Sequence, residues 1–159
     1  MLIKLCLLGW FATCAYQDLR HRRVGNWLTL GGALIALLFL LVQGHTLTGY
    51  SSRAALAALS LALLMSVPGF WLGKLGAADV KALAALGLAS DPLTLLYTLG
   101  LASLFSLAVM FASKLLIDSD KLPANYKTQL AGLLPSRSRT FPFIFSLFAG
   151  LLLTLSITP

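Results

Sequence analysis

Residues 92–117 read PLTLLYTLGLASLFSLAVMFASKLLI, an apolar stretch in which Lys114 is the one charged residue. The stretch exceeds the about 20 apolar residues that an α-helix needs to cross the hydrocarbon core of a bilayer. Five further apolar stretches occupy residues 2–17, 26–43, 54–73, 77–90 and 141–158. This pattern predicts an all-α, polytopic membrane protein: a bundle of about six transmembrane helices that forms a single domain over residues 1–159.

The composition supports the same class. Hydrophobic residues make up 58% of the 159-residue chain and charged residues 11%, whereas soluble domains carry about 25% charged residues. The first apolar stretch has the length of a signal-peptide core, but only Lys4 lies in its amino-terminal part, and Asp18 and a basic cluster follow it directly. We therefore expect the first stretch to be retained as a span and not removed.

Local sequence signals place several helix ends. Asn26 is expected to cap the second helix, and Asp91 followed by Pro92 provides a cap and a first-turn proline for the fifth, so we interpret Asp91 as structural. The 77–90 stretch is short for a span, and its small residues allow neighbouring helices to approach closely. Residues 114–140 are the one long polar connection and are expected to form a loop at the membrane surface.

The positive charges predict the orientation. If the six helices alternate across the membrane, ten Lys and Arg residues lie on one side and only Lys4 and Arg53 on the other. Because cytoplasmic loops are enriched in Lys and Arg, we expect the N-terminus outside and the 114–140 loop in the cytoplasm. The net charge of +7 then follows from topology and attraction to anionic lipid, and it gives no argument for nucleic-acid binding.

This orientation places Asp18 and Asp79 on the same, cytoplasmic face. The chain has five Asp and no Glu, and an ionisable group at the edge of a bilayer is costly and usually functional. Two carboxylates close together in a partly desolvated site share a proton, so one acts as a base towards water and the other as an acid towards the scissile peptide. Which of the two is the base stays open.

A purely structural interpretation is equally compatible with these residues. In it, Asp18 pairs with the arginines at positions 20, 22 or 23, while Asp79 caps its helix and Lys81 extends to the surface. The residues alone leave both interpretations open.

The remaining reactive side chains suggest no other chemistry. Cys6 and Cys14 are eight residues apart in an apolar segment, which does not fit a CxxC redox or zinc site. His21 and His45 are expected on opposite sides of the membrane, so they cannot share a metal ion or complete a nucleophile pair. We therefore expect no metal and no cofactor.

Three motifs carry a resemblance to a known family. Residues 18–26 read DLRHRRVGN, residues 76–81 read GAADVK, and residues 140–143 read TFPF. In order, they resemble the stretch after the first catalytic aspartate, the GxGDxK motif and the proline-containing start of the last helix of type IV prepilin peptidases. These are membrane aspartyl proteases of the GxGD type. The resemblance implies that Asp18 and Asp79 are catalytic.

The same resemblance suggests residues that support the site or bind substrate, and it shows two departures. The supporting candidates are Gly76, Ala78, Lys81, Arg23 and Asn26. Ala78 stands where the family has a glycine immediately before the second aspartate, and Gly25 stands where a proline usually precedes the asparagine. A methyl group at position 78 could change activity or substrate fit where backbone must approach closely.

By this resemblance the protein is a prepilin peptidase of the bacterial cytoplasmic (inner) membrane. It would remove the N-terminal leader of prepilins or pseudopilins at the cytoplasmic face, just before the substrate's hydrophobic helix. The chain lacks the long insertion with paired CxxC motifs of bifunctional members, which implies neither zinc nor methyltransferase activity. It is similar to the short, peptidase-only forms of tight-adherence or Flp pilus systems.

Two alternatives come from other classes. A non-catalytic membrane subunit of a pilus-assembly or transport system could have kept the fold, and Ala78 supports that alternative. A lipoprotein signal peptidase has a comparable size, but its asparagine-rich aspartate motifs are not present here and its site lies on the opposite membrane face.

Overall fold

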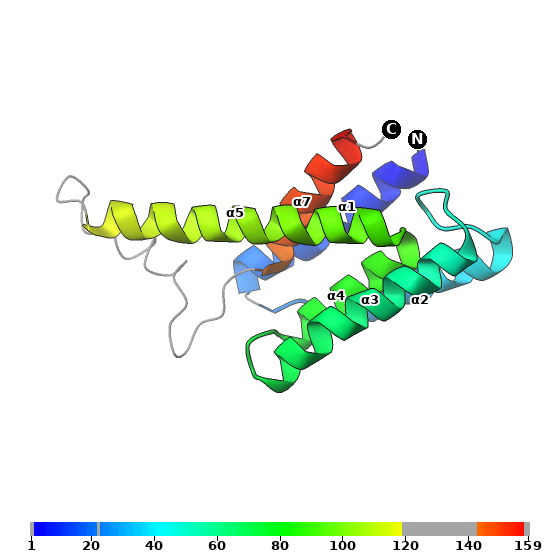
Figure 1. The fold of residues 1–159 in the computed structure, drawn as a ribbon, viewed down its shortest axis with the longest axis horizontal. Coiled ribbons are helices and arrows are strands. Elements are labelled where there is room, and N and C mark those ends of the chain that lie inside the picture. Colours follow the sequence, from blue (N-terminus) through cyan, green and yellow to red (C-terminus); the bar gives the residue numbers. More distant parts are fainter. Residues whose placement is uncertain (1, 22, 119–142, 158–159) are drawn as a thin grey trace.

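A computed structural model describes residues 2–21, 23–118 and 143–157, without the side chains of residues 2, 117 and 118, and these residues are almost entirely helical. The helices, shown in Figure 1, are α1 (Leu2–His21), α2 (Asn26–Gln43), α3 (Ser52–Trp71), α4 (Ala77–Ala89), α5 (Pro92–Asp118) and α7 (Phe143–Ile157). Among the described residues there is no strand, only an isolated bridge between His45 and Ser51. The prediction of an all-α protein is confirmed.

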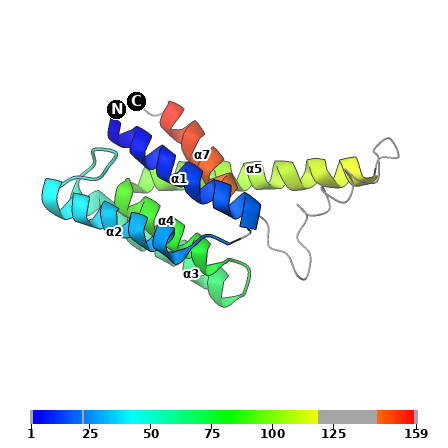
Figure 2. The ribbon, with the colours of Figure 1, turned by 180° about the vertical axis from the view of Figure 1, so that it is seen from behind.

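The helices form two groups. The short α4 packs along both α2 and α3, while α7 packs against both α1 and α5. Figures 1 and 2 show the same division from opposite sides, with the start of α1 close to the end of α7. Contacts between the groups are fewer and join α3 to α5, α4 to α5 and α7, and α1 to α2. We call the boundary along which α1 faces α2 and α4 the seam.

Within the described residues, three helices meet the length and composition needed to cross a membrane: α2, α3 and α5. Their outer faces carry exposed apolar side chains such as Val42, Leu64 and Phe111, which suit contact with lipid tails. The 13 residues of α4 rise about 20 Å, less than the about 30 Å of a bilayer core. The protein is thus a helical membrane protein in which α4 is too short to be a span of its own.

The helix starts confirm one sequence prediction and correct another. Asp91 caps α5 as predicted, since its Oδ2 accepts hydrogen bonds from the backbone N–H groups of Leu93 (3.1 Å) and Thr94 (3.4 Å). The prediction that Asn26 caps α2 is wrong: the N-cap is Gly25, with no side-chain cap, and Asn26 is the first helical residue. The Asn26 side chain is used elsewhere, as described below.

Two helices are longer than the apolar pattern indicated. The apolar stretch ends at residue 17, but α1 continues through a polar last turn to His21. α5 continues to Asp118, so the first five residues of the predicted 114–140 loop are helix. The rest of that loop, and most of the 140–143 motif, lie outside the described residues.

Small residues bring α4 close to α3. The buried residues of α3 are Ala55, Ala58, Ala62 and Ser66, one narrow stripe of small side chains. A Cβ added to Gly87 would lie 2.9 Å from the backbone of Leu59, closer than real Cβ contacts. The predicted close approach of the 77–90 segment to its neighbours is therefore confirmed, and it fixes where α4 begins relative to α3.

This contact predicts that Gly87→Ala destabilises the bundle. The added methyl group meets backbone that cannot rotate away, so α4 must shift, at a cost of about 1–3 kcal/mol. Thermal unfolding in detergent micelles measures the effect. Gly100→Ala is the matched control, since nothing lies within 4 Å of a Cβ at that helical position. Equal unfolding temperatures for the two variants would contradict the proposed contact.

Candidate active site

Asp18 lies in the last turn of α1 and is 7% exposed. Its Oδ2 accepts hydrogen bonds from the backbone N–H groups of Ile144 at 3.0 Å and Phe145 at 3.3 Å. Both donors belong to the first turn of α7, whose N–H groups have no partners within their own helix. The carboxylate of one helix thus caps another helix, at the end that favours negative charge.

Sequence reasoning missed this partner of Asp18. It anticipated an arginine close in the chain or a second carboxylate, whereas Ile144 is 126 residues away. The 140–143 motif, which resembles the start of the family's last helix, was the one signal pointing to this region. Of the nearby arginines, Arg22 lies outside the described residues, and Arg23 is exposed between α1 and α2.

Asp79 lies in the first turn of α4 and caps its own helix, as the structural interpretation proposed. Its Oδ2 accepts a hydrogen bond from the Gly76 N–H at 3.0 Å, and its own N–H donates to the Gly76 carbonyl at 3.1 Å. A Cβ at position 76 would come within 3.0 Å of the same Oδ2, so glycine suits this position. The Ala78 methyl group, which replaces the family glycine, packs against the hydrophobic core.

The two carboxylates interact electrostatically. Asp79 lies outside the three candidate spans. Burial raises the pKa of Asp79 to about 7, the Gly76 N–H opposes the rise, and the charge of Asp18 adds to it. At neutral pH Asp79 therefore holds a proton for much of the time, while Asp18 accepts two N–H donors, an arrangement that favours a carboxylate. The surroundings of the two carboxyl groups therefore favour different protonation states.

Lys81 and Asn26 join α4 to α2. The Lys81 Nζ donates to the Asn26 Oδ1 at 2.7 Å, a charge-assisted hydrogen bond. Asn26 is exposed and Lys81 half-buried, so the ammonium group remains near the surface. The structure thus brings these two predicted supporting residues together, two positions along α4 from Asp79.

The other reactive side chains lie apart from this site. Cys6 is exposed and Cys14 is buried, both on α1. His45 follows α2 and stacks edge-to-face on Phe39, whereas His21 ends α1. Within residues 2–21, 23–118 and 143–157, no group of three or more His, Cys or Asp side chains could hold a metal ion.

The cap predicts different stabilities for two Asp18 variants. Asp18→Ala removes the acceptor of two backbone N–H groups and should destabilise the protein by about 1–3 kcal/mol, with faster hydrogen exchange at Ile144 and Phe145. Asp18→Asn keeps an acceptor oxygen and should lose less. Unfolding in micelles and amide exchange by mass spectrometry check both effects. If both variants match the parent protein in stability and in amide exchange, Asp18 does not hold α7.

Comparison with known families places the chain in one of them. The sequence profile of the type IV leader peptidase family matches residues 5–111, a range that contains both Asp18 and Asp79. No curated protein matches the chain, and no solved structure does. The matched range is about two thirds of the chain and includes α1 to α4 and most of α5. The chain belongs to the type IV leader peptidase family, which implies aspartic-type peptidase activity in general.

Proposed function

We propose that this protein removes the leader peptides of prepilins or pseudopilins at the cytoplasmic face of the membrane, with Asp18 and Asp79 as its catalytic pair. One observation carries the proposal. Asp18 accepts hydrogen bonds at the start of α7 and Asp79 at the start of α4, on helices from the two different groups, and the charge of Asp18 contributes to the raised pKa of Asp79. Opposed protonation states in one site are what a dyad needs.

The hydrogen bonds support an assignment of roles. Asp18, with two N–H donors on Oδ2, is the base and takes a proton from the attacking water. Asp79 gives its proton to the oxygen of the scissile carbonyl, which yields a neutral gem-diol. When the C–N bond breaks, Asp18 passes its proton to the leaving nitrogen and a gem-diol hydroxyl returns a proton to Asp79. Both side chains regain their starting states.

The basic residues support the proposed topology. Arg20, Arg23, Lys74 and Lys81 flank the ends of α1, α2, α3 and α4 at which the two aspartates lie. The positive-inside rule then favours a cytoplasmic site and an external N-terminus. We accordingly propose a multi-pass protein of the bacterial inner membrane that forms one peptidase domain over residues 1–159. A basic face also attracts acidic groups near the substrate's membrane junction.

The supporting residues have geometric roles in this proposal. Gly76 leaves room for the Asp79 carboxyl group, and Ala78 packs against the hydrophobic core. The hydrogen bond between Lys81 and Asn26 holds α2 beside the site, and Arg23 lies exposed where a leader would arrive. With two cysteines in the chain, a zinc module of paired CxxC motifs cannot form from this sequence, so we propose peptidase activity without methyltransferase activity.

A non-catalytic membrane subunit is the second candidate. One observation favours it: each aspartate also caps a helix, a role that a member without activity would keep. Ala78 in place of the family glycine agrees with this candidate. The two proposals differ in whether the carboxyl groups are needed for cleavage of a leader.

Leader cleavage should require both dyad residues and not the third helix-capping aspartate. When co-expressed with candidate prepilins, Asp18→Asn and Asp79→Asn should reduce cleavage by at least about a thousandfold. Asp91→Asn, which alters a cap outside the site, should cleave at nearly the parent rate. Gel mobility of the substrate reports leader removal.

The outcomes separate the two candidates. Full cleavage by both dyad variants contradicts the catalytic pair. Absence of cleavage by the parent protein with every prepilin tested favours the non-catalytic subunit. Equal loss in the Asp91→Asn variant would mean that capping, and not acid–base chemistry, limits the reaction.

The pKa of Asp79 also predicts a pH profile. Because Asp79 must be protonated to act as the acid and its pKa lies at about 7, kcat/KM should be highest below that pH and fall about tenfold per pH unit above it. Cleavage of a leader peptide substrate in micelles between about pH 5 and about pH 9 measures this. A profile that stays flat to the alkaline limit would exclude Asp79 as the acid.

A further inference from the structure

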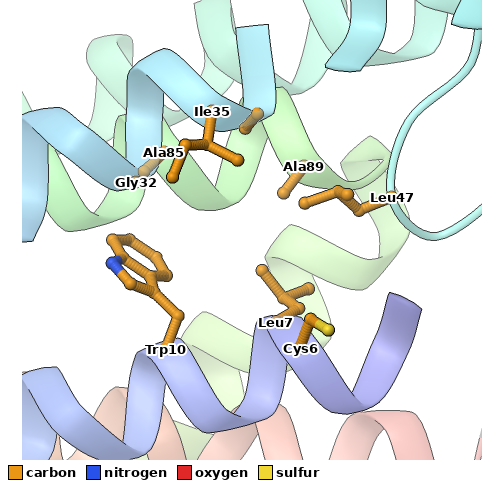
Figure 3. Close-up of a pocket in the computed structure, with 9 residues that line it drawn as sticks. Cys6, Leu7, Trp10, Gly32, Ile35, Leu47, Ala85 and Ala89 are labelled. Atoms are coloured by element: carbon orange, nitrogen blue, oxygen red, sulfur yellow. The ribbon is translucent and has the colours of Figure 1, made fainter. Parts of the chain in front are cut away.

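An apolar cavity of about 190 Å³ lies in the seam. Figure 3 shows the side chains that converge on it: Leu7 and Trp10 from α1, Ile35 from α2 beside the backbone of Gly32, and Ala85 and Ala89 from α4. Leu47, from the connection between α2 and α3, closes one end. The cavity is therefore built by the two helices that carry the aspartates, together with α2.

One wall of the cavity is held in place. The Trp10 Nε1 donates to the Leu28 carbonyl on α2 at 3.0 Å, which fixes the plane of the indole ring. The ring occupies the position that a Cβ of residue 32 would take, so glycine at this position is required. Trp10 also stacks edge-to-face on Phe11, with ring centroids 4.6 Å apart. The space beside it is preformed and does not depend on a flexible side chain.

Burial shows on which side the cavity opens. Its floor is buried, with Leu7, Ala85 and Ala89 at most 4% exposed. Its rim is open, since Ile35 is 64% exposed and Cys6 is exposed as well. The opening lies between α1 and α2, and α2 is one of the candidate membrane spans. A ligand would thus enter sideways from the lipid and not from water.

The cavity lies along the seam from the catalytic pair. Trp10 precedes Asp18 by eight residues on α1, and Ala85 follows Asp79 by six on α4, so the cavity is about 9–12 Å deeper along the helices. A peptide that starts at the aspartates covers this distance in about three or four extended residues or about six to eight helical ones. A substrate cut at its membrane junction would place the start of its apolar segment there.

We propose that this cavity binds one large apolar side chain of the substrate, from the apolar segment about three to eight residues after the scissile bond. The proposal rests on the proposed function, and it adds a specificity pocket on the membrane side of the dyad. The size is suitable, since a dry apolar cavity of about 150 Å³ accommodates a benzene ring. The lining is almost entirely apolar: the Trp10 N–H is already bonded, and the one other heteroatom group on a lining side chain is the weakly polar thiol of Cys6 at the rim.

The pocket predicts a size-dependent change in KM. Ala85→Leu fills the cavity and should raise KM by about tenfold, while kcat stays within about twofold because the dyad is untouched. Ile35→Ala removes an exposed rim side chain without a folding cost and should raise KM to a smaller extent. Ala57→Leu makes the same change as Ala85→Leu at an exposed position of α3 and serves as the matched control with unchanged KM.

Substitutions in the substrate provide the decisive test. Alanine substitutions are made one at a time in the apolar segment of a substrate that the parent enzyme cleaves. One position should raise KM for the parent enzyme, and the same shortened substrate should restore a near-parent KM to Ala85→Leu. If no substrate position compensates for Ala85→Leu, or if both cavity variants keep the parent KM, the pocket does not bind substrate. Those results leave the proposed function intact. If the proposed function itself is wrong, the parent protein does not cleave the substrate.

Discussion

The hydrogen bonds between Asp18 and the first turn of α7 join the first described helix of the chain to the last. A buried carboxylate is tolerated when N–H groups satisfy it, and a helix start is tolerated when an acceptor satisfies its N–H groups. Here the Asp18 carboxylate accepts hydrogen bonds from two N–H groups at the start of α7, at 3.0 and 3.3 Å. Because α7 packs against α1 and α5, this contact sets the position of one whole helix group. It also fixes the direction in which one half of the candidate dyad faces.

The other half of the dyad depends on the second group. Asp79 is positioned by the cap of α4, and α4 is positioned by the close approach of Gly87 to α3. The separation of the two carboxyl groups is therefore a property of the seam and not of either helix alone. Residues that lie far from the chemistry, such as Trp10 and Gly32, contribute to the same seam.

Much of this architecture could be predicted from the sequence because apolar stretches of span length have few alternatives in a membrane. The Asp91 cap was predictable because its partners are two and three residues away. The Asp18 cap was not, because its partners are separated from it by more than one hundred residues. Asn26 was assigned to a cap because local rules favour it there, but a tertiary hydrogen bond from Lys81 took precedence. The cavity likewise depends on a contact between Trp10 and Gly32 that no local pattern shows.

The most direct test of the coupled pair follows the carboxyl group of Asp79 itself. Infrared difference spectroscopy detects the protonated carboxyl group, and the band absent in Asp79→Asn identifies it. If Asp18 and Asp79 interact as described, this band should titrate with a pKa of about 7. In Asp18→Asn the pKa of Asp79 should fall, because the neighbouring charge is gone, but should stay above its ordinary value of 3.8 because burial remains. A pKa near 3.8 in the parent protein, unchanged by Asp18→Asn, would contradict the pair.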